Sequence, residues 1–236
     1  LCTELYENRT SLMFTTSYQA NIGVLSLVAQ EYDLILIDKL AHISLYDAVK
    51  LSGKKFRVYT HNNVEVVNKI VESNIGMNIL IVTDGVFSAD GDFANLTALC
   101  KIKHQHPNVK LYVDDAHGVG MLGNKGQGLV EHYNCLDDVD FLIGTMSKAF
   151  GSTGGFVNFK NPQLAESIRF RCSTYNASRA VSPGVAAASC MALNINKEEG
   201  DSRRQYLKEL VEYTHDALSL LNINTLHSKS AVIPIV

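Results

Sequence analysis

Short apolar runs alternate with amphipathic segments along most of this chain. The apolar runs predict strands at residues 11–14, 34–38, 56–59, 79–83, 110–113, 139–143 and 156–159. The segments around them predict helices at residues 1–8, 20–30, 64–73, 162–171, 184–194 and 201–221. Short, nearly continuous apolar runs are typical of strands that are buried on both faces. Their alternation with helices predicts an α/β fold, in which helices cover both faces of a mostly parallel sheet.

Two parts of unequal size are expected from this pattern. Residues 1–183 contain all the predicted strands of the sheet and form one large domain, whereas residues 184–236 hold connecting helices and the beginning of a small C-terminal domain. The chain opens inside a predicted helix and stops in a strand-like run at residues 231–236. We therefore expect further chain beyond both ends.

Composition and charge narrow the class of protein. The 236 residues are 46% hydrophobic and 19% charged, which is typical of a globular protein, and the net charge of −3 gives no electrostatic argument for a nucleic-acid partner. No apolar stretch is long enough to span a bilayer and no signal peptide is present, although a peripheral membrane contact stays open. The five cysteines are widely spaced, without a C-x-x-C pair. This spacing predicts a cytoplasmic protein without a zinc site.

One lysine, Lys148, stands among small residues between the last two predicted strands, in the segment 144–156. Small side chains leave room for a ligand, and glycines let the backbone come close to it. A lysine that is partly desolvated in such a place has a lowered pKa, and its amine becomes a nucleophile towards carbonyl groups. Considered alone, the residue could equally be a surface lysine in a loop.

Asp114 and His117 follow the strand predicted at residues 110–113, and a spacing of three residues places both side chains over one pocket. Ligands of open α/β sheets gather at this end of the strands. The pair could be half of a metal site, but no third ligand is visible. It could also be a base with its orienting carboxylate, but no G-x-S-x-G elbow accompanies it.

Two motifs together resemble the signature of the α-oxoamine synthases, which are fold-type I enzymes that depend on pyridoxal phosphate (PLP). The motifs are Asp114-Asp115-Ala116-His117-Gly118 and Thr145-x-Ser147-Lys148-Ala149-Phe150-Gly151. The resemblance extends from about Phe14 to the C-terminus. It implies a three-layer fold with a mostly parallel sheet, in which the strand at residues 156–159 is the one antiparallel strand.

The resemblance also implies a role for each candidate site residue. Lys148 matches the lysine that holds PLP as a Schiff base, and Asp114 matches the carboxylate that pairs with the protonated pyridine nitrogen. His117 matches a histidine at the 3-oxygen of the ring, and His42 matches one that stacks on the ring face. Further contacts with the cofactor are expected from Ser17, Tyr18, Ser88, Thr145, Ser147 and Ser178.

Two positions depart from the family pattern or depend on a second subunit. Ser17, before Tyr18, stands where relatives carry a glycine, in a turn that is either a phosphate cradle or an ordinary helix cap. Ser178 lies in the segment 173–183, predicted as a loop, whose counterpart in relatives reaches the phosphate of the neighbouring subunit. A homodimer is therefore implied.

The reaction implied is the decarboxylating condensation of an amino acid with an acyl-CoA, with Lys148, His117, Asp114 and His42 as catalytic residues. The loop at residues 84–96 resembles bacterial serine palmitoyltransferases most, with 8-amino-7-oxononanoate synthase and 2-amino-3-ketobutyrate CoA ligase as alternatives. A catalytically silent partner subunit of such an enzyme is an alternative of another class. Lys148 argues against it, because such a subunit would lack the Schiff-base lysine. An aminotransferase or aldolase of the same fold type is disfavoured by the Asp-x-x-His spacing.

Overall fold

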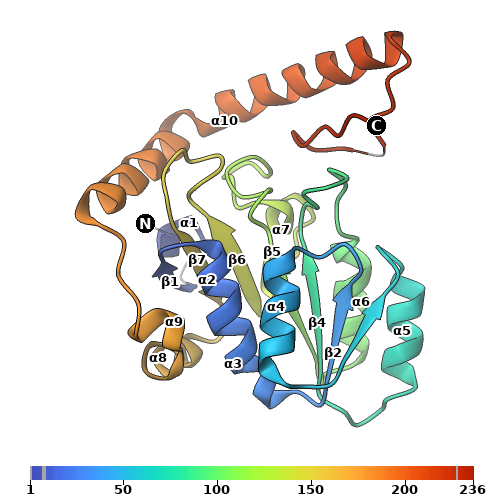
Figure 1. Cartoon of the computed structure of the whole chain (residues 1–236). Coiled ribbons are helices and arrows are strands. Elements are labelled where there is room, and N and C mark those ends of the chain that lie inside the picture. Colours follow the sequence, from blue (N-terminus) through green and yellow to red (C-terminus); the bar gives the residue numbers. More distant parts are fainter. Residues whose placement is uncertain (1, 7–8, 227) are drawn as a thin grey trace.

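The computed structural model describes residues 2–6, 9–226 and 228–236, and seven strands form a single sheet at its centre (Figure 1). The strand order is β1-β7-β6-β5-β4-β2-β3. The strands are β1 (Thr10–Phe14), β2 (Leu34–Asp38), β3 (Phe56–Tyr59), β4 (Ile79–Asp84), β5 (Val109–Asp114), β6 (Phe141–Thr145) and β7 (Gly155–Phe159). β7 pairs antiparallel with β1 and β6, and the other pairings are parallel. The predicted α/β fold with one antiparallel strand is confirmed.

Both faces of the sheet are covered by helices, which explains the continuous apolar runs. In β4, Leu80 and Val82 pack into the core on one face, and Ile79 and Ile81 pack into the core on the other. The first core is closed by α2 (Ser17–Ala20), α3 (Ser26–Val28), α4 (Ile43–Ser52) and α8 (Pro162–Arg171). The second is closed by α5 (Val64–Glu72), α6 (Leu96–Gln105) and α7 (Leu129–His132).

The helical run after β1 begins three residues earlier than predicted and is not a regular α-helix. The Thr16 hydroxyl accepts a hydrogen bond from the backbone N–H of Gln19 at 3.1 Å and so caps α2. A π-helical segment, η1 (Asn21–Leu25), connects α2 with α3, and a 3-10 turn (Ala29–Glu31) ends the run. Short π segments are frequent at functional sites.

The two helices predicted at residues 184–194 and 201–221 are one helix, α10 (Pro183–Leu220), which crosses over the sheet and extends past it (Figure 1). The prediction of a break was wrong because the residues in between are compatible with a helix. Lys197, Glu198 and Glu199 are good helix formers. Gly200 is buried, and Asn196 and Arg204 contact one another beside it at 2.6 Å.

Three smaller predictions differ from the structure. Residues 231–236 form no strand, since this end of the described chain pairs with no neighbouring strand and is connected to the β4 loop by a bond from the Lys229 N–H to the Gly91 carbonyl at 3.1 Å. The loop predicted at residues 173–183 contains a short helix, α9 (Ser173–Asn176). The first helix is α1 (Cys2–Leu5), and residues 1, 7 and 8 of its predicted range lie outside the described residues.

The division into residues 1–183 and 184–236 stays a prediction.

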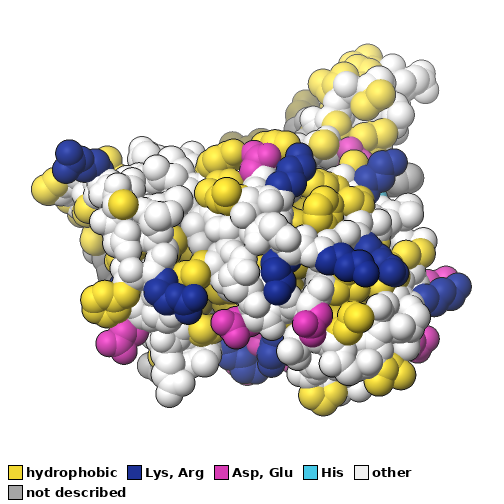
Figure 2. Space-filling model, turned by 60° about the horizontal axis from the view of Figure 1, so that its bottom comes forward, with side chains coloured by type: hydrophobic (Ala, Val, Ile, Leu, Met, Phe, Trp, Pro, Cys, Tyr) yellow, Lys and Arg dark blue, Asp and Glu magenta, His cyan; other side chains and the backbone are white. Residues whose placement is uncertain are grey.

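On the lower face, away from the carboxyl ends of the strands, basic and acidic side chains are interspersed with apolar ones (Figure 2). No helix of the described residues is both long and apolar enough to cross a membrane.

Candidate active site

All strands of the sheet except β7 run in the same direction and end at the same edge, and the candidate residues come from the segments that follow them. Asp84, Asp114 and Thr145 are the last residues of β4, β5 and β6. The register pairs Asp84 with Asp114 across β4 and β5, and Thr145 with Gly155 across β6 and β7. The segments that carry Lys148, His117 and His42 leave this same edge (Figure 1). The fold thus gathers residues that are more than a hundred positions apart in sequence.

Asp114 is buried but surrounded by donors. Its Oδ1 accepts from the backbone N–H of Ala116 at 3.1 Å, and its Oδ2 accepts from the side-chain amide of Asn21 at 2.5 Å. Burial raises the pKa of Asp114, whereas the Asn21 hydrogen bond and the charge of Lys148 act in the opposite direction. The carboxylate is therefore held in a dry place by groups that favour its ionised form.

Asp84 lies beside Asp114 and is the second buried carboxyl of the site. Its Oδ2 accepts from the backbone N–H of His42 at 2.9 Å. Burial, and then the charge of Asp114, raise the pKa of Asp84 well above its usual range. Two adjacent buried carboxyls do not both ionise readily. Asp114 accepts from the Asn21 side chain, whereas Asp84 accepts only from the His42 amide among the described residues, so the surroundings favour the charge on Asp114 over one on Asp84.

Lys148 reaches solvent from the turn after β6 and is surrounded by carboxyl groups. The protein atoms around its amine desolvate the ammonium ion and lower its pKa, and the charges of Asp114, Asp84 and Asp115 only partly offset this effect. A lower pKa gives a larger fraction of free amine at neutral pH. The environment of Lys148 is therefore that of a nucleophile or base, not that of an ordinary surface lysine.

The two candidate histidines are held differently. His42 is exposed and caps α4, where its Nδ1 lies 2.7 Å from the Ser44 hydroxyl and 3.3 Å from the Ser44 backbone N–H, from which it accepts. His117 is half-buried, and burial followed by the charges of Lys148 and His42 lowers its pKa to about 4. The His117 ring is therefore neutral near pH 7.

Asp115 fixes the turn that carries His117. Three glycines, Gly85, Gly118 and Gly128, pack so closely on its buried carboxyl that a Cβ at any of them would lie 2.0–2.3 Å from a carboxyl oxygen. Leu129 donates its backbone N–H to Asp115 Oδ2 at 2.5 Å. A side chain at these glycines would displace the turn, which explains why Gly118 and Gly128 stand in the segment after the Asp-x-x-His motif.

Hydroxyl groups collect near the start of β7. The hydroxyls of Thr145 and Ser147 lie 2.8 Å apart, and Thr145 also donates to the Gly154 carbonyl at 3.0 Å. A Cβ built on Gly155 would lie 2.2 Å from the Ser17 backbone nitrogen, so the start of α2 rests directly on β7. Three of the predicted contacts, Ser17, Thr145 and Ser147, are thus brought together.

Three other predicted contacts are not drawn into this group. Tyr18 is exposed, and its hydroxyl donates to Asp47 at 2.6 Å. Ser88 and Ser178 are exposed, and neither side chain forms a hydrogen bond within the residues that the structure describes. Their contacts with a cofactor stay predictions.

Sequence reasoning missed Asn21 and Ser44, which connect the site beneath its surface. Asn21 is fully buried within a helical segment whose neighbours Ala20, Val24 and Leu25 are apolar and buried. A polar residue in the apolar stripe of a helix was the available signal, because such a side chain needs a buried partner. The long-range partner itself could not be found from local sequence.

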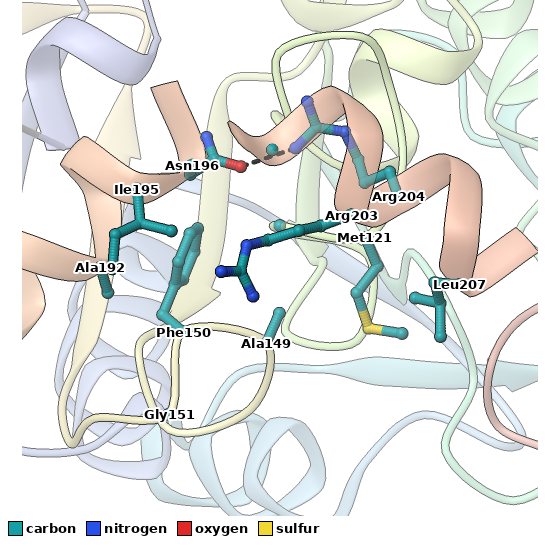
Figure 3. Close-up of a pocket in the computed structure, with 12 residues that line it drawn as sticks. Met121, Ala149, Phe150, Gly151, Ala192, Ile195, Asn196, Arg203, Arg204 and Leu207 are labelled. Atoms are coloured by element: carbon teal, nitrogen blue, oxygen red, sulfur yellow. Dashed lines mark hydrogen bonds between the residues drawn. The ribbon is translucent and has the colours of Figure 1, made fainter. Parts of the chain in front are cut away.

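A cavity of about 430 Å³ lies beside the turn that follows Lys148, between Ala149–Gly151 and α10 (Figure 3). Met121, Phe150 and Leu207 line it with apolar surface, and the Arg203 guanidinium extends into it. Arg203 also donates two hydrogen bonds to Glu199, at 2.9 and 2.6 Å. No group of three His, Cys, Asp or Glu side chains among the described residues is placed to bind a metal ion.

Comparison with known proteins agrees with this arrangement. The family model for aminotransferase class I and II matches residues 2–236. The 8-amino-7-oxononanoate synthase of Saccharophagus degradans is 40% identical over 227 residues, which cover 96% of this chain and 56% of the relative. That of Stutzerimonas stutzeri is 38% identical, covering 95% of this chain and 57% of the relative. The chain thus spans a little over half the length of these curated relatives.

Two solved structures share the fold. A serine palmitoyltransferase variant from S. paucimobilis, solved with PLP and myriocin bound, superposes with a TM-score of 0.92 at 26% identity and covers 100% of this chain and 61% of its own. The 8-amino-7-oxononanoate synthase of Francisella tularensis superposes with a TM-score of 0.82 at 25% identity, covering 97% and 65%. The chain therefore belongs to the aminotransferase class I and II family and, within it, to the α-oxoamine synthases that its two motifs resemble.

Proposed function

We propose that the carboxyl edge of the sheet binds PLP and that the protein condenses an amino acid with an acyl thioester, with loss of the amino acid's carboxylate. The observation that carries the proposal is the meeting of Lys148, with its lowered amine pKa, and the buried pair Asp114 and Asp84 at one edge. This combination of a reactive amine with an ionised carboxylate in a dry site matches what PLP needs from a protein.

The residues fit the cofactor part by part. Lys148 offers an amine for the carbonyl carbon, and Asp114 offers a charge for the pyridine nitrogen. His42 presents an exposed flat ring, and the hydroxyls around Thr145 offer donors for the phosphate. When bound, PLP supplies an electron sink for the electron pair left when a bond to the substrate Cα breaks.

The chain's own groups have distinct roles in this proposal. Asp114 holds the proton on the pyridine nitrogen, while neutral Asp84 fixes the backbone of His42 without adding a second charge. Lys148, once free, takes the proton from the substrate Cα, because its lowered pKa leaves part of the amine unprotonated. The neutral His117 ring is available to donate a hydrogen bond to an oxygen of the ring or the substrate.

The substrates are better matched to 8-amino-7-oxononanoate synthase than to serine palmitoyltransferase. Curated relatives with the first name are 35–41% identical to this chain and supply the preference. The solved structures do not separate the two names, since they are 25–30% identical whichever name they carry. The preference first drawn from residues 84–96 is thus replaced by its stated alternative. The named product carries an amine at C8, beside a terminal methyl, and a carboxylate at C1. Alanine and a seven-carbon dicarboxylic acyl thioester would give it after loss of carbon dioxide.

A homodimer is part of the same proposal. The segment that carries Ser178 runs along the outside of the molecule between α9 and α10, and its side chains from residues 176 to 180 are exposed (Figure 1). Such a segment is free to contact a second copy, and twofold dimers are the commonest soluble assembly. Sedimentation of the full-length protein as a monomer with full activity would exclude this part of the proposal.

Thiol release by the purified full-length protein tests the function. The protein is supplied with PLP and with alanine or serine, each combined with the heptanedioyl or the palmitoyl thioester of CoA. Alanine with heptanedioyl-CoA should give the fastest release of CoA, together with carbon dioxide in equal amount. Faster turnover of serine with palmitoyl-CoA would restore the first preference. Release of CoA by every pair of substrates without any carbon dioxide would exclude the condensation.

A further inference from the structure

A single buried amide connects the two sides of the candidate cofactor site. One N–H of the Asn21 side chain donates to Asp114 Oδ2 at 2.5 Å, and the other donates to the Ser44 hydroxyl at 2.9 Å. The Asn21 carbonyl oxygen accepts from the Tyr112 hydroxyl at 3.0 Å. Asn21 and Ser44 have no exposed surface, and neither does Tyr112. The amide therefore uses both donors and its acceptor within the protein.

The orientation of the amide is determined by its partners. Tyr112 keeps its proton, because burial and the nearby Asp114 raise the pKa of its hydroxyl well above the usual range. Of the two ends of the Asn21 amide, only the oxygen can accept this proton. A reversed amide would point its oxygen at the Asp114 carboxylate, which has no proton to share when ionised. The observed orientation is thus the one that suits a charged Asp114.

The same chain of bonds continues to His42. Ser44 accepts from Asn21, so its own hydroxyl proton is free to point at His42 Nδ1, 2.7 Å away. The Ser44 backbone N–H also donates to this nitrogen. Two donors at Nδ1 leave the proton of the neutral imidazole on Nε2. The direction of every bond from Tyr112 to His42 is therefore the same.

The local backbone places Asn21 for this task. Asn21 is the first residue of the π-helical segment η1, in which the wider turn shifts side-chain directions relative to a regular α-helix. The side chain lies where β5 ends and α4 begins, since its partners come from those two elements. Asn21 thus joins three elements of the site rather than filling a gap in the core.

We propose that Asn21 is a positioning residue that holds Asp114 ionised and His42 in its Nε2–H form, and so couples the group expected at the pyridine nitrogen to the ring expected on its face. The inference rests on the proposed PLP site. The other titratable groups around this carboxyl are Tyr112 within β5, Asp84 from β4, Asp115 from the turn after β5, His42 at the start of α4 and Lys148 from the turn after β6. Lys148 and His42 favour its charge electrostatically, and Asn21 favours it as the side-chain hydrogen-bond donor.

The test compares Asn21→Leu with Asn158→Leu. Asn158 is also fully buried, and its amide donates to Arg9 O and Ser11 Oγ near the far end of β7. Both substitutions remove a buried amide, so both should lower stability, but only Asn21→Leu should change the site. The first readout is the tautomer of His42, measured by ¹⁵N NMR in cofactor-free protein. The second is the pH at which a ¹⁵N-labelled pyridine nitrogen of bound PLP loses its proton.

In Asn21→Leu we expect a mixture of His42 tautomers, loss of the pyridine proton at a lower pH, and PLP affinity weaker by roughly tenfold or more, the scale of a lost hydrogen bond to a charged group. Asn158→Leu should match the wild type in all three. Identical tautomer and pyridine titration in Asn21→Leu and the wild type would overturn the inference. Failure of the wild type to bind PLP would instead overturn the proposed function.

Two milder variants keep the inference testable if Asn21→Leu does not fold. Ser44→Ala removes only the bond toward His42, so it should shift the tautomer and leave the pyridine titration unchanged. Tyr112→Phe removes the donor that orients the amide, so it should shift both readouts by less than Asn21→Leu. A Ser44→Ala protein with an unchanged His42 tautomer would contradict the proposed coupling.

Discussion

The carboxyl edge of the sheet and helix α10 show two ways in which this chain reaches a defined structure. At the edge, Asp115 and Asn21 have no exposed surface and Asp114 is 5% exposed, yet each has hydrogen-bond partners from distant parts of the chain. Along α10, Tyr206 and Tyr213 are 63% and 73% exposed, and the side-chain bonds are mostly local. Conformation at the edge depends on long-range contacts, whereas in α10 it depends mainly on helix propensity.

The largest expected effect separates two carboxyls within the edge. Asp114→Asn removes the charge proposed for the pyridine nitrogen, and we expect turnover to fall about a hundredfold or more, the scale for loss of an electrostatic stabiliser. Asp84→Asn replaces a neutral carboxyl by a neutral amide, whose oxygen can still accept from His42, so the loss should be about tenfold at most. Turnover of both variants is measured with PLP in excess. Equal losses would show that the two carboxyls share the charge.

Substitutions in the core beneath the edge should lower the free energy of unfolding much more than substitutions on the surface of α10. Ile81 is 1% exposed in β4, and Ile81→Ala leaves a cavity that should cost about 2–5 kcal/mol of unfolding free energy. Tyr213→Ala, on the exposed face of α10, should change it by about 0.5 kcal/mol or less. Urea unfolding of both variants measures the difference. A cost at Tyr213 similar to that at Ile81 would mean that α10 is packed against another part of the protein or a second copy.

The pH dependence of stability tests the burial of His117. Its pKa of about 4 in the folded chain lies below the value of about 6.5 for an unfolded histidine, because burial and the charges of Lys148 and His42 oppose protonation. The unfolded chain therefore binds this proton first, and the stability that neutral His117 supports, complete above about pH 6.5, is lost as the pH falls towards 4. Between about pH 6.5 and pH 4 the free energy of unfolding should therefore fall. We expect this fall to be smaller in His117→Gln by roughly 1–2 kcal/mol, after allowance for solvent screening. A fall of equal size in both proteins would contradict this assignment.

The smallest effect is expected from a surface ion pair on α10. Arg203 and Glu199 are bonded at 2.6 Å, but both side chains are more than half exposed. Exposed pairs at this helical spacing contribute about 0.3–0.5 kcal/mol. Glu199→Gln should therefore alter unfolding by no more than a few tenths of a kcal/mol. A larger change in thermal unfolding would indicate that Arg203 also binds another group, such as an anion in the neighbouring cavity.

Much of the fold could be predicted because its signals are local. Each strand predicted for the sheet lies within two residues of an observed one, and the central strands were the clearest, since a strand buried on both faces must be apolar throughout. The family resemblance implied that Asp114 and Lys148 share one cofactor site, and the structure brings both to one edge because parallel strands end together. The break predicted in α10 was wrong because the residues between 194 and 201 include good helix formers, which continue the helix without a turn.

The site could be predicted only at its surface. Lys148, His117 and His42 are carried by motifs, but the partners beneath them are set by packing between distant elements. Asn21 is 93 positions from Asp114, and no pattern in its helix names that partner. The contacts expected from Ser88 and Ser178 stay predictions, because both side chains are exposed and form no hydrogen bond among the described residues.

Covalent labelling of the lysine tests the central claim most directly. The full-length protein is saturated with PLP, reduced with borohydride and digested, and the peptides are analysed by mass spectrometry. We expect a yellow protein whose colour is bleached by reduction, and a pyridoxyl group on Lys148. A label on any other lysine, or none at all, would contradict the assignment of this edge as the PLP site.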